Sequence, residues 1–314
     1  MKVGGEHVNS TLHSLASHQP TTIPQIARWT ERKKKEFIIM KKTTIKKLLA
    51  VASVAFLGSL ILTGCGKSSS DQSLKQIQDK KELVLGTSAD YPPFEFTTMK
   101  DGKKQIVGYD ILIAQQIAKD MGVKLKVVNT AFPSLISELQ DKKVDIVMAG
   151  MVSTDQRKKA VDFTKSYYKN SNVLLVKKGE AAKYNTVASL KGKAVGAQQS
   201  TTQEKIGKKQ LAAANLVTEA NFTNLTNEVK TGTLSGVIAE KVVADNVIKS
   251  NPGQYEIAQV KLKTPASDAP VSIAVRKNSP ALKKQLNKSI TKLQKNGDLD
   301  KFMQKAQDLQ LEQK

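Results

Sequence analysis

Apolar and polar positions between residues 83 and 149 follow the order of an α/β sheet. Three short apolar runs end in small or turn-forming residues, and stretches with helical spacing separate them. The expected strands cover residues 83–88, 123–128 and 144–149, and the expected helices cover residues 110–121 and 132–139. Nearly continuous apolar strands in strand–helix–strand order are typical of parallel sheets covered on both faces, so we predict a doubly wound α/β fold.

The pattern continues beyond residue 170 with a second set of elements. Thr201 and Glu204 fit a capping box at the start of a helix that runs through Ile206. An Asn-Gly pair at residues 296–297 separates two helices near the end of the chain. The other expected strands cover residues 173–176, 194–197, 237–239 and 271–275, and the other expected helices cover residues 225–230, 242–248, 280–294 and 298–309.

The first 64 residues have the features of a leader. Met40 is followed by four lysines and by an apolar run over residues 48–62, which is too short for a membrane span. The run ends in Leu-Thr-Gly-Cys, which resembles the lipobox of bacterial lipoproteins and contains the only cysteine of the chain, Cys65. The alternative is a buried helix followed by a structural cysteine. The glycine- and serine-rich stretch after Cys65 favours a flexible tether instead.

We therefore expect a signal peptide over residues 40–64, lipidation of Cys65 and a tether over residues 65–74. Residues 1–39 show no sustained periodicity and precede the signal peptide. The residues just before Met40 can be encoded by purine-rich codons that spell a ribosome-binding site. We interpret residues 1–39 as a mis-assigned extension, and a genuine basic extension stays open as the alternative.

The composition of the chain excludes several classes of functional site. The chain has 314 residues, 50 Lys and Arg, 28 Asp and Glu, and a formal net charge of +22. After residue 64 the chain holds 40 basic and 25 acidic residues. Of the basic residues, 38 are lysines scattered along the chain, so a solvated lysine surface is favoured over nucleic-acid binding. All histidines and the tryptophan precede Met40. Histidine-dependent catalysis, histidine-ligated metals and multi-cysteine sites are therefore excluded from the later residues, and we expect no cofactor.

Six short strings occur in a characteristic order along the chain. They cover residues 86–96, 107–111, 135–147, 149–157, 161–168 and 271–277. In this order they resemble the solute-binding proteins of amino-acid ABC transporters, the bacterial extracellular solute-binding protein family 3. The resemblance implies a two-lobed α/β fold of the periplasmic-binding-protein type II, with doubly wound sheets joined by a two-strand hinge.

The resemblance also divides the chain. Lobe 1 is expected to comprise residues 75–170 and 270–314, and lobe 2 residues 171–269. The chain would cross between the lobes near residues 170–172 and 264–269. Ligands of open α/β sheets bind outside the carboxyl ends of the strands, so the ligand is expected between the lobes.

The charged ends of a free amino acid find matching residues. Arg157 presents a planar fork for a carboxylate, and its Thr-x-x-Arg setting resembles the carboxylate-binding arginine of the family. Thr201 and Thr202 begin a helix whose free N–H groups form an anion site, although Ser200 stands where the family usually has glycine. Glu240 occupies the position of the amine-binding acid, with an exposed acid at a helix start as the alternative.

The resemblance assigns other parts of the ligand to aromatic and backbone positions. Tyr91 and Phe132 correspond to aromatics that sandwich the ligand side chain, with core packing as the alternative. Gly150 and Val152 lie where the backbone meets the ammonium group. The family often has Thr or Ser at position 152, so one side-chain hydrogen bond is missing here.

Two further positions, Ser88 and Gln198, lie where relatives select the side chain of the ligand. Several relatives have an acid at position 88, and its absence weakens the case for a strictly cationic ligand. Arg276 follows an expected strand, and we interpret it as a surface or interlobe residue. We interpret Asp145 and Asp162 as structural.

The leading hypothesis is a receptor that closes on a polar L-amino acid and presents it to an ABC permease with its ATPase. It would be a monomer, anchored by lipid to the outer face of the cell membrane of a Gram-positive bacterium, and not an enzyme. A secreted dehydratase on the same scaffold and a basic surface adhesion protein are the alternatives. Glutamine, arginine, lysine and other polar amino acids stay open as ligands.

Overall fold

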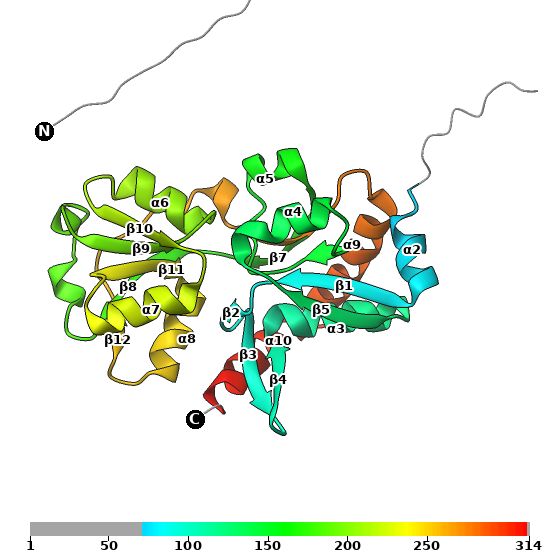
Figure 1. Ribbon diagram of the computed structural model, residues 1–314, viewed down its shortest axis with the longest axis horizontal. Helices are drawn as coiled ribbons and strands as arrows, with labels where there is room; N and C mark the ends of the chain where they lie inside the picture. Colours follow the sequence, from blue (N-terminus) through cyan, green and yellow to red (C-terminus); the bar gives the residue numbers. More distant parts are fainter. Residues whose placement is uncertain (1–70, 313–314) are drawn as a thin grey trace, which may run out of the picture. The chain divides into compact units, whose positions relative to one another are not determined.

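The computed structural model describes residues 71–312. The predicted extension over residues 1–39, the predicted signal peptide and Cys65 lie outside these residues. The described chain folds into two lobes, each built on a five-stranded sheet, with a separate three-stranded sheet beside the first (Figure 1). We call the lobe that contains both described ends of the chain lobe 1 and the other lobe 2.

The sheet of lobe 1 has the strand order β5-β1-β6-β13-β7. Its strands are β1 (Glu82–Thr87), β5 (Lys124–Asn129), β6 (Ile146–Val147), β7 (Asp162–Lys169) and β13 (Pro270–Val275). Strands β1, β5 and β6 are parallel, whereas β13 runs antiparallel to both β6 and β7. Helices α3, α9 and α10 pack on one face and α4 on the other, so both faces are buried.

The remaining elements of lobe 1 are helices and a hairpin. The helices are α2 (Ser73–Lys80), α3 (Tyr109–Met121), α4 (Leu135–Gln140), α5 (Asp155–Ala160), α9 (Pro280–Lys295) and α10 (Asp298–Leu311), with the short 3₁₀ turn η1 (Phe132–Ser134). The three-stranded sheet consists of β2 (Asp90–Tyr91), β3 (Glu95–Lys100) and β4 (Lys103–Val107). The predicted turn at residues 101–102 joins β3 to β4.

The start of α2 corrects one predicted boundary. The tether was expected to extend to residue 74, but the helix begins at Ser73. The Asp71 carboxylate accepts hydrogen bonds from the backbone N–H groups of Ser73, at 2.9 Å, and of Ala281, which ties the helix start to α9. Polar composition alone does not reveal such a long-range contact.

Lobe 2 has the strand order β10-β9-β11-β8-β12. Its strands are β8 (Asn172–Lys177), β9 (Ala194–Gln198), β10 (Asn215–Glu219), β11 (Gly236–Glu240) and β12 (Tyr255–Ile257). Its helices are α6 (Thr202–Gln210), α7 (Phe222–Thr231) and α8 (Lys241–Ser250), and its 3₁₀ turns are η2 (Ala181–Lys183) and η3 (Ala188–Leu190); a last turn, η4 (Ala266–Asp268), lies on the return to lobe 1. Helix α6 covers one face of the sheet, and α7 and α8 cover the other.

Both sheets are mixed, which refines the expectation of parallel sheets. The chain enters lobe 2 through β8, which runs antiparallel to β11, and returns to lobe 1 through β13. The two crossings lie side by side, because the Asn170 N–H donates to the Ala269 carbonyl at 2.8 Å and the Asn172 N–H to Thr264 Oγ1 at 2.9 Å. Strands β8 and β13 each enter their sheet from the side of the other lobe. They therefore run antiparallel to their neighbours β11 and β6.

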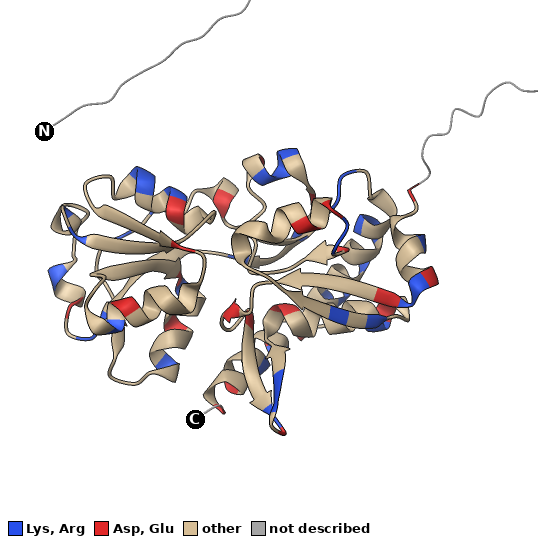
Figure 2. Cartoon of the chain, in the orientation of Figure 1, with Lys and Arg blue, Asp and Glu red and all other residues tan. Residues whose placement is uncertain are grey.

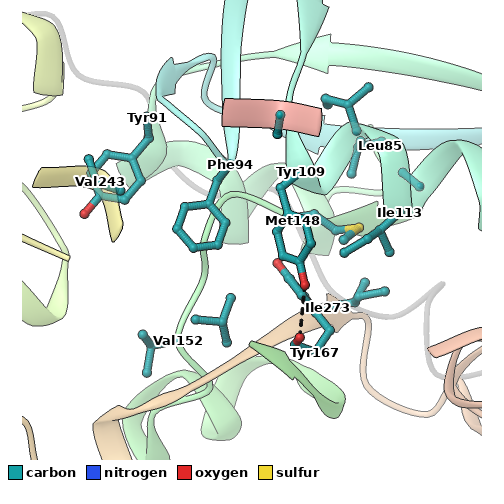
Figure 3. Packing of buried hydrophobic residues seen from close by; sticks show 14 of the residues in the cluster. Leu85, Tyr91, Phe94, Tyr109, Ile113, Met148, Val152, Tyr167, Val243 and Ile273 are labelled. Carbon is teal, nitrogen blue, oxygen red and sulfur yellow. Dashed lines mark hydrogen bonds between the residues drawn. The ribbon is translucent and has the colours of Figure 1, made fainter. Parts of the chain in front are cut away.

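A row of aromatic rings leads from the gap between the lobes into the core of lobe 1 (Figure 3). Ring centroids are 6.2 Å apart for Tyr91 and Phe94, and 5.9 Å apart both for Phe94 and Tyr109 and for Tyr109 and Tyr167. The Tyr109 hydroxyl donates to the Tyr167 carbonyl at 3.2 Å. Gly108 makes this packing possible, because a Cβ there would lie 2.3 Å from the Phe94 carbonyl oxygen. The core thus fixes one wall of the cleft.

Candidate functional site

A small cavity lies between the lobes. Nine of the ten predicted ligand-binding residues line it: Tyr91, Phe132, Gly150, Val152, Arg157, Gln198, Thr201, Thr202 and Glu240. Ala149 and Gln203, which the sequence analysis did not single out, complete the lining. The tenth predicted residue, Ser88, does not line the cavity.

Arg157 stands at the junction of the two lobes. The Thr154 hydroxyl caps α5 by accepting the Arg157 N–H at 3.2 Å. The guanidinium donates to the Val152 carbonyl of lobe 1 at 2.8 Å and to the Ser200 carbonyl of lobe 2 at 2.9 Å, and it lies 5.2 Å from the centre of the Phe132 ring. Among residues 71–312 it has no carboxylate within ion-pair distance. Burial lowers the pKa of Arg157 to about 10.

The start of α6 faces Arg157 from lobe 2. The Thr201 hydroxyl accepts the Glu204 N–H at 3.2 Å, as the capping box predicts, but the Glu204 carboxylate receives the Ser200 N–H, at 2.6 Å, instead of the Thr201 N–H. Ser200 has a φ of 64°, in the left-handed region where glycine is favoured. This turn aims the Ser200 carbonyl at Arg157 and leaves the first turn of α6, with Thr202, on the cavity wall.

Glu240 is the acid of the cavity. It ends β11, forms the N-cap of α8 and is 2% exposed. Its N–H donates to the Tyr91 hydroxyl of lobe 1 at 3.2 Å, whereas its Oε2 atom has no hydrogen-bond partner within the described part of the chain. Burial raises the pKa of Glu240 well above its ordinary value; nearby Asp110 raises it further, while Arg157 and Gln203 oppose the shift.

Two buried acids behind the cavity were missed as site residues. The Asp110 carboxylate accepts the Gly150 N–H at 2.9 Å and the Tyr167 hydroxyl at 3.0 Å, and so holds Gly150 at a φ of 54°. Burial raises the pKa of Asp110 to about 7. Glu95 is fully buried, and burial followed by the charge of Asp110 raises its pKa well above the ordinary value. The available sequence signal was an acid between apolar or aromatic residues, Phe94 and Phe96 for Glu95, and Tyr109 and Ile111 for Asp110.

The two predicted selectors of the ligand side chain meet at another acid, Asp90. The Ser88 hydroxyl donates to Asp90 Oδ1 at 2.9 Å, and the Gln198 amide donates to Asp90 Oδ2 at 3.3 Å and to the Ala220 carbonyl at 2.9 Å. Of these, Gln198 lines the cavity, whereas Ser88 and Asp90 lie behind the wall.

The expectation for Arg276 is wrong. Its side chain is only 16% exposed, donates to the Val144 carbonyl at 2.5 Å and pairs with Asp145 at 3.4 Å. The register explains this position, because Val275 pairs with Ile146 at the end of the sheet and directs the next residue under the preceding loop. Arg276 is therefore a structural residue of lobe 1.

Asp145 and Asp162 make structural contacts. The second Asp145 oxygen accepts the Val84 N–H at 3.1 Å, and Asp162 pairs with Lys277 at 2.8 Å.

Between residues 71 and 312, no helix is long and apolar enough to span a membrane, and no group of three or more His, Cys, Asp or Glu residues is arranged to hold a metal ion. Lysines are spread over both lobes (Figure 2).

Residues 83–307 match the bacterial extracellular solute-binding proteins, family 3. The chain belongs to this family. It is 36% identical to the arginine-binding extracellular protein ArtP of Bacillus subtilis, over 85% of this chain and 98% of ArtP. It is 35% identical to the ABC transporter arginine-binding protein 1 of Escherichia coli, over 71% of this chain and 89% of that protein. The amino acid ABC transporter substrate-binding protein AbpA of Streptococcus pneumoniae, solved bound to L-arginine, is 35% identical with a TM-score of 0.73, over 76% of this chain and 99% of AbpA.

These comparisons confirm the predicted family and the two-lobed type II fold. The chain is an extracellular protein that binds an amino acid for ABC import, and it is not an enzyme, so the dehydratase alternative is dropped. The adhesion alternative is not tested by them.

Proposed function

We propose that this protein is an L-arginine receptor, with the amino acid held in the cavity between the lobes. The observation that carries the proposal is a pair of unmatched charged groups in the cavity lining, one from each lobe. Arg157 has no carboxylate partner among residues 71–312, and Glu240 has a buried oxygen without a hydrogen bond there. A buried charge is costly unless it is paired, and a zwitterion supplies both missing partners.

The ligand carboxylate would bind the Arg157 guanidinium and the free N–H groups at the start of α6, beside Thr201 and Thr202. Its ammonium group would bind Glu240 and the backbone near Gly150 and Val152. The ammonium charge would also offset the burial that raises the pKa of Glu240, and so favour the ionised carboxylate.

The side chain would lie between Tyr91 and Phe132, both of which line the cavity. A cationic side chain suits the electrostatics better than a neutral one. Four buried acids lie at or directly behind the wall: Asp90, Glu95, Asp110 and Glu240. Arg157 is the only cationic side chain in the cavity lining. Arginine brings a net positive charge into this surplus of carboxyl groups, whereas glutamine brings none, and the two relatives and AbpA are named for or bound to arginine.

Closure would follow from contacts that the ligand makes with both lobes. Arg157 and Tyr91 come from lobe 1, whereas Thr201 and Glu240 come from lobe 2, so a ligand that binds them all favours the closed arrangement. The closed, monomeric receptor would then deliver arginine to the membrane subunits of an ABC importer with its ATPase.

The anchor belongs to the same proposal. Cys65 in its lipobox would carry acyl chains and hold the receptor on the outer face of the membrane. Mass spectrometry of membrane-extracted protein should find an acylated N-terminus at Cys65. An unlipidated N-terminus upstream of it would contradict the anchor and leave arginine binding untouched.

The ligand is tested by a thermal-shift screen of the twenty amino acids, followed by calorimetry. L-arginine should give the largest shift, since a ligand at 100 times its Kd stabilises by about 2.7 kcal/mol. Glu240→Gln should weaken arginine binding by about 30-fold or more, because the ammonium loses its charged partner. Asp245→Asn, which changes a half-buried acid on the adjacent helix α8 that pairs with Lys241, is the matched control and should bind as the parent does. A larger shift with a neutral amino acid would contradict the choice of arginine.

A further inference from the structure

Asp90 is an acid that does not line the ligand cavity but that accepts a hydrogen bond from Gln198, which does. It lies in β2 of lobe 1, directly before the cavity residue Tyr91, and is 9% exposed. Three donors reach its carboxylate: the Ser88 hydroxyl, the Gln198 amide and the Phe222 N–H, the last at 2.6 Å.

Two of these three donors belong to the opposite lobe. Gln198 ends β9, and Phe222 is the first residue of α7, so the carboxylate meets the positive end of a lobe 2 helix. If the lobes separate, these contacts break and the carboxylate regains water. Closure therefore moves a negative charge from solvent into the protein.

The described residues in contact with Asp90 provide no cation to neutralise this charge. Its donors are a hydroxyl, an amide and a backbone N–H, and the charge of Asp90 contributes to the raised pKa of another buried acid, Glu95. Burial accordingly raises the pKa of Asp90 despite its three hydrogen bonds. Closing the lobes on an ionised Asp90 is thus unfavourable unless positive charge arrives with the ligand.

We propose that Asp90 is a specificity-determining residue, which favours closure on an amino acid with a cationic side chain over closure on a neutral one of the same shape. The inference rests on the proposed arginine-receptor function. The charge acts through the wall, because Gln198 both lines the cavity and donates to Asp90. The Ser88 hydroxyl donates to Asp90 Oδ1 at 2.9 Å from two residues earlier in the chain, and so helps to hold the carboxylate behind the wall.

The test compares L-arginine with L-citrulline, which has nearly the same shape but a neutral ureido group. Calorimetry on the parent and on Asp90→Asn gives both affinities. We expect Asp90→Asn to weaken arginine binding by about 10- to 100-fold, as the loss of one unit charge at close range implies, and to leave citrulline binding unchanged or stronger, because closure no longer buries an unpaired charge. Citrulline binding also shows that the variant is folded. Asp141→Asn, an exposed acid of lobe 1, is the matched control.

Other outcomes separate the possibilities. An equal loss for both ligands would make Asp90 a general contact between the lobes and would overturn the specificity role, as would no change for either. Glu240→Gln should weaken both ligands, since both carry the α-ammonium group, and this pattern differs from that of Asp90→Asn. A parent protein that binds neither ligand would refute the proposed function itself.

Discussion

Arg157 and Arg276 are the two arginines between residues 71 and 312, and both donate to backbone carbonyls of lobe 1. Their environments differ in one respect. Arg276 also has a carboxylate partner, Asp145 at 3.4 Å, whereas Arg157 has none among the described residues and instead bridges to the Ser200 carbonyl of lobe 2. Carbonyl oxygens satisfy hydrogen bonds but bring no full negative charge.

We propose that this difference separates a structural arginine from a ligand-binding one. A cation that is paired with a carboxylate inside one lobe stabilises that lobe, and its charge is already neutralised when a ligand arrives. A partly buried cation without an anion, placed where two lobes meet, is completed by an anion from outside. Both residues follow apolar strands in the sequence, so it is the partner of each guanidinium that distinguishes their roles.

The largest expected effect comes from Arg157→Ala. The carboxylate of the ligand would be desolvated without its partner, which should cost about 2–5 kcal/mol, or roughly 30-fold to several thousandfold in Kd. Calorimetry with L-arginine measures this loss, and the urea midpoint of the unliganded protein should show that the variant is folded. Lys158→Ala, an exposed lysine on the same helix that pairs with Asp155 at 3.0 Å, should bind like the parent. Unchanged binding by Arg157→Ala would require the receptor hypothesis to be abandoned.

Arg276→Ala should show the opposite pattern. It removes the donor of Asp145 Oδ1 and of the Val144 carbonyl, so the free energy of unfolding should fall by about 1–3 kcal/mol, while the Kd for arginine stays within about threefold. Urea unfolding without ligand and calorimetry give the two values. Lys277→Ala, the next residue and a surface partner of Asp162, should lose no more than about 1 kcal/mol. A larger Kd for arginine together with unchanged stability would show that Arg276, like Arg157, acts in ligand binding and would contradict the difference between the two arginines.

Ser200→Gly should have the smallest effect. Ser200 is held at a φ of 64°, and glycine adopts this conformation without steric cost, so the unfolding free energy should rise by a few tenths to about 1 kcal/mol after the entropy of the unfolded chain is included. The carbonyl that meets Arg157 is retained, so arginine affinity should hardly change. Ser137→Gly, within α4, should instead lower stability by about 0.5 kcal/mol. Destabilisation by Ser200→Gly would show that this turn is not strained.

Local patterning was enough to predict much of the fold. Helix α3 ends at Met121, as expected, with Gly122 as its C-cap, and the capping contact between Thr201 and Glu204 is present. Six strands were not predicted: β2, β3, β4, β7, β10 and β12. Strand β7 has polar residues interspersed with aromatics, so its hydrophobic period is unclear, and it becomes a strand because β13 pairs with it.

The site was predicted unevenly, for a related reason. Arg157 stands in a short string that resembles a family motif, and Glu240 follows an expected strand at the position of the family's amine-binding acid, so each could be named from its place in the sequence. Asp90 could not, because two of its partners, Gln198 and Phe222, are 108 and 132 residues away along the chain. Arg276 was misjudged for the same reason, since Asp145 lies 131 residues before it.

By itself, the sequence determined the α/β architecture, the family and the identities of the charged groups available to a ligand, because periodicity, turn residues and short motifs are local properties. Only the tertiary structure decided which charges are neutralised and which are not. Pairing depends on distances between residues far apart in the chain and on the water that folding removes. Arg276 thus became part of the scaffold of lobe 1, while Arg157 and Glu240 were left with unmatched charges on the wall of one cavity.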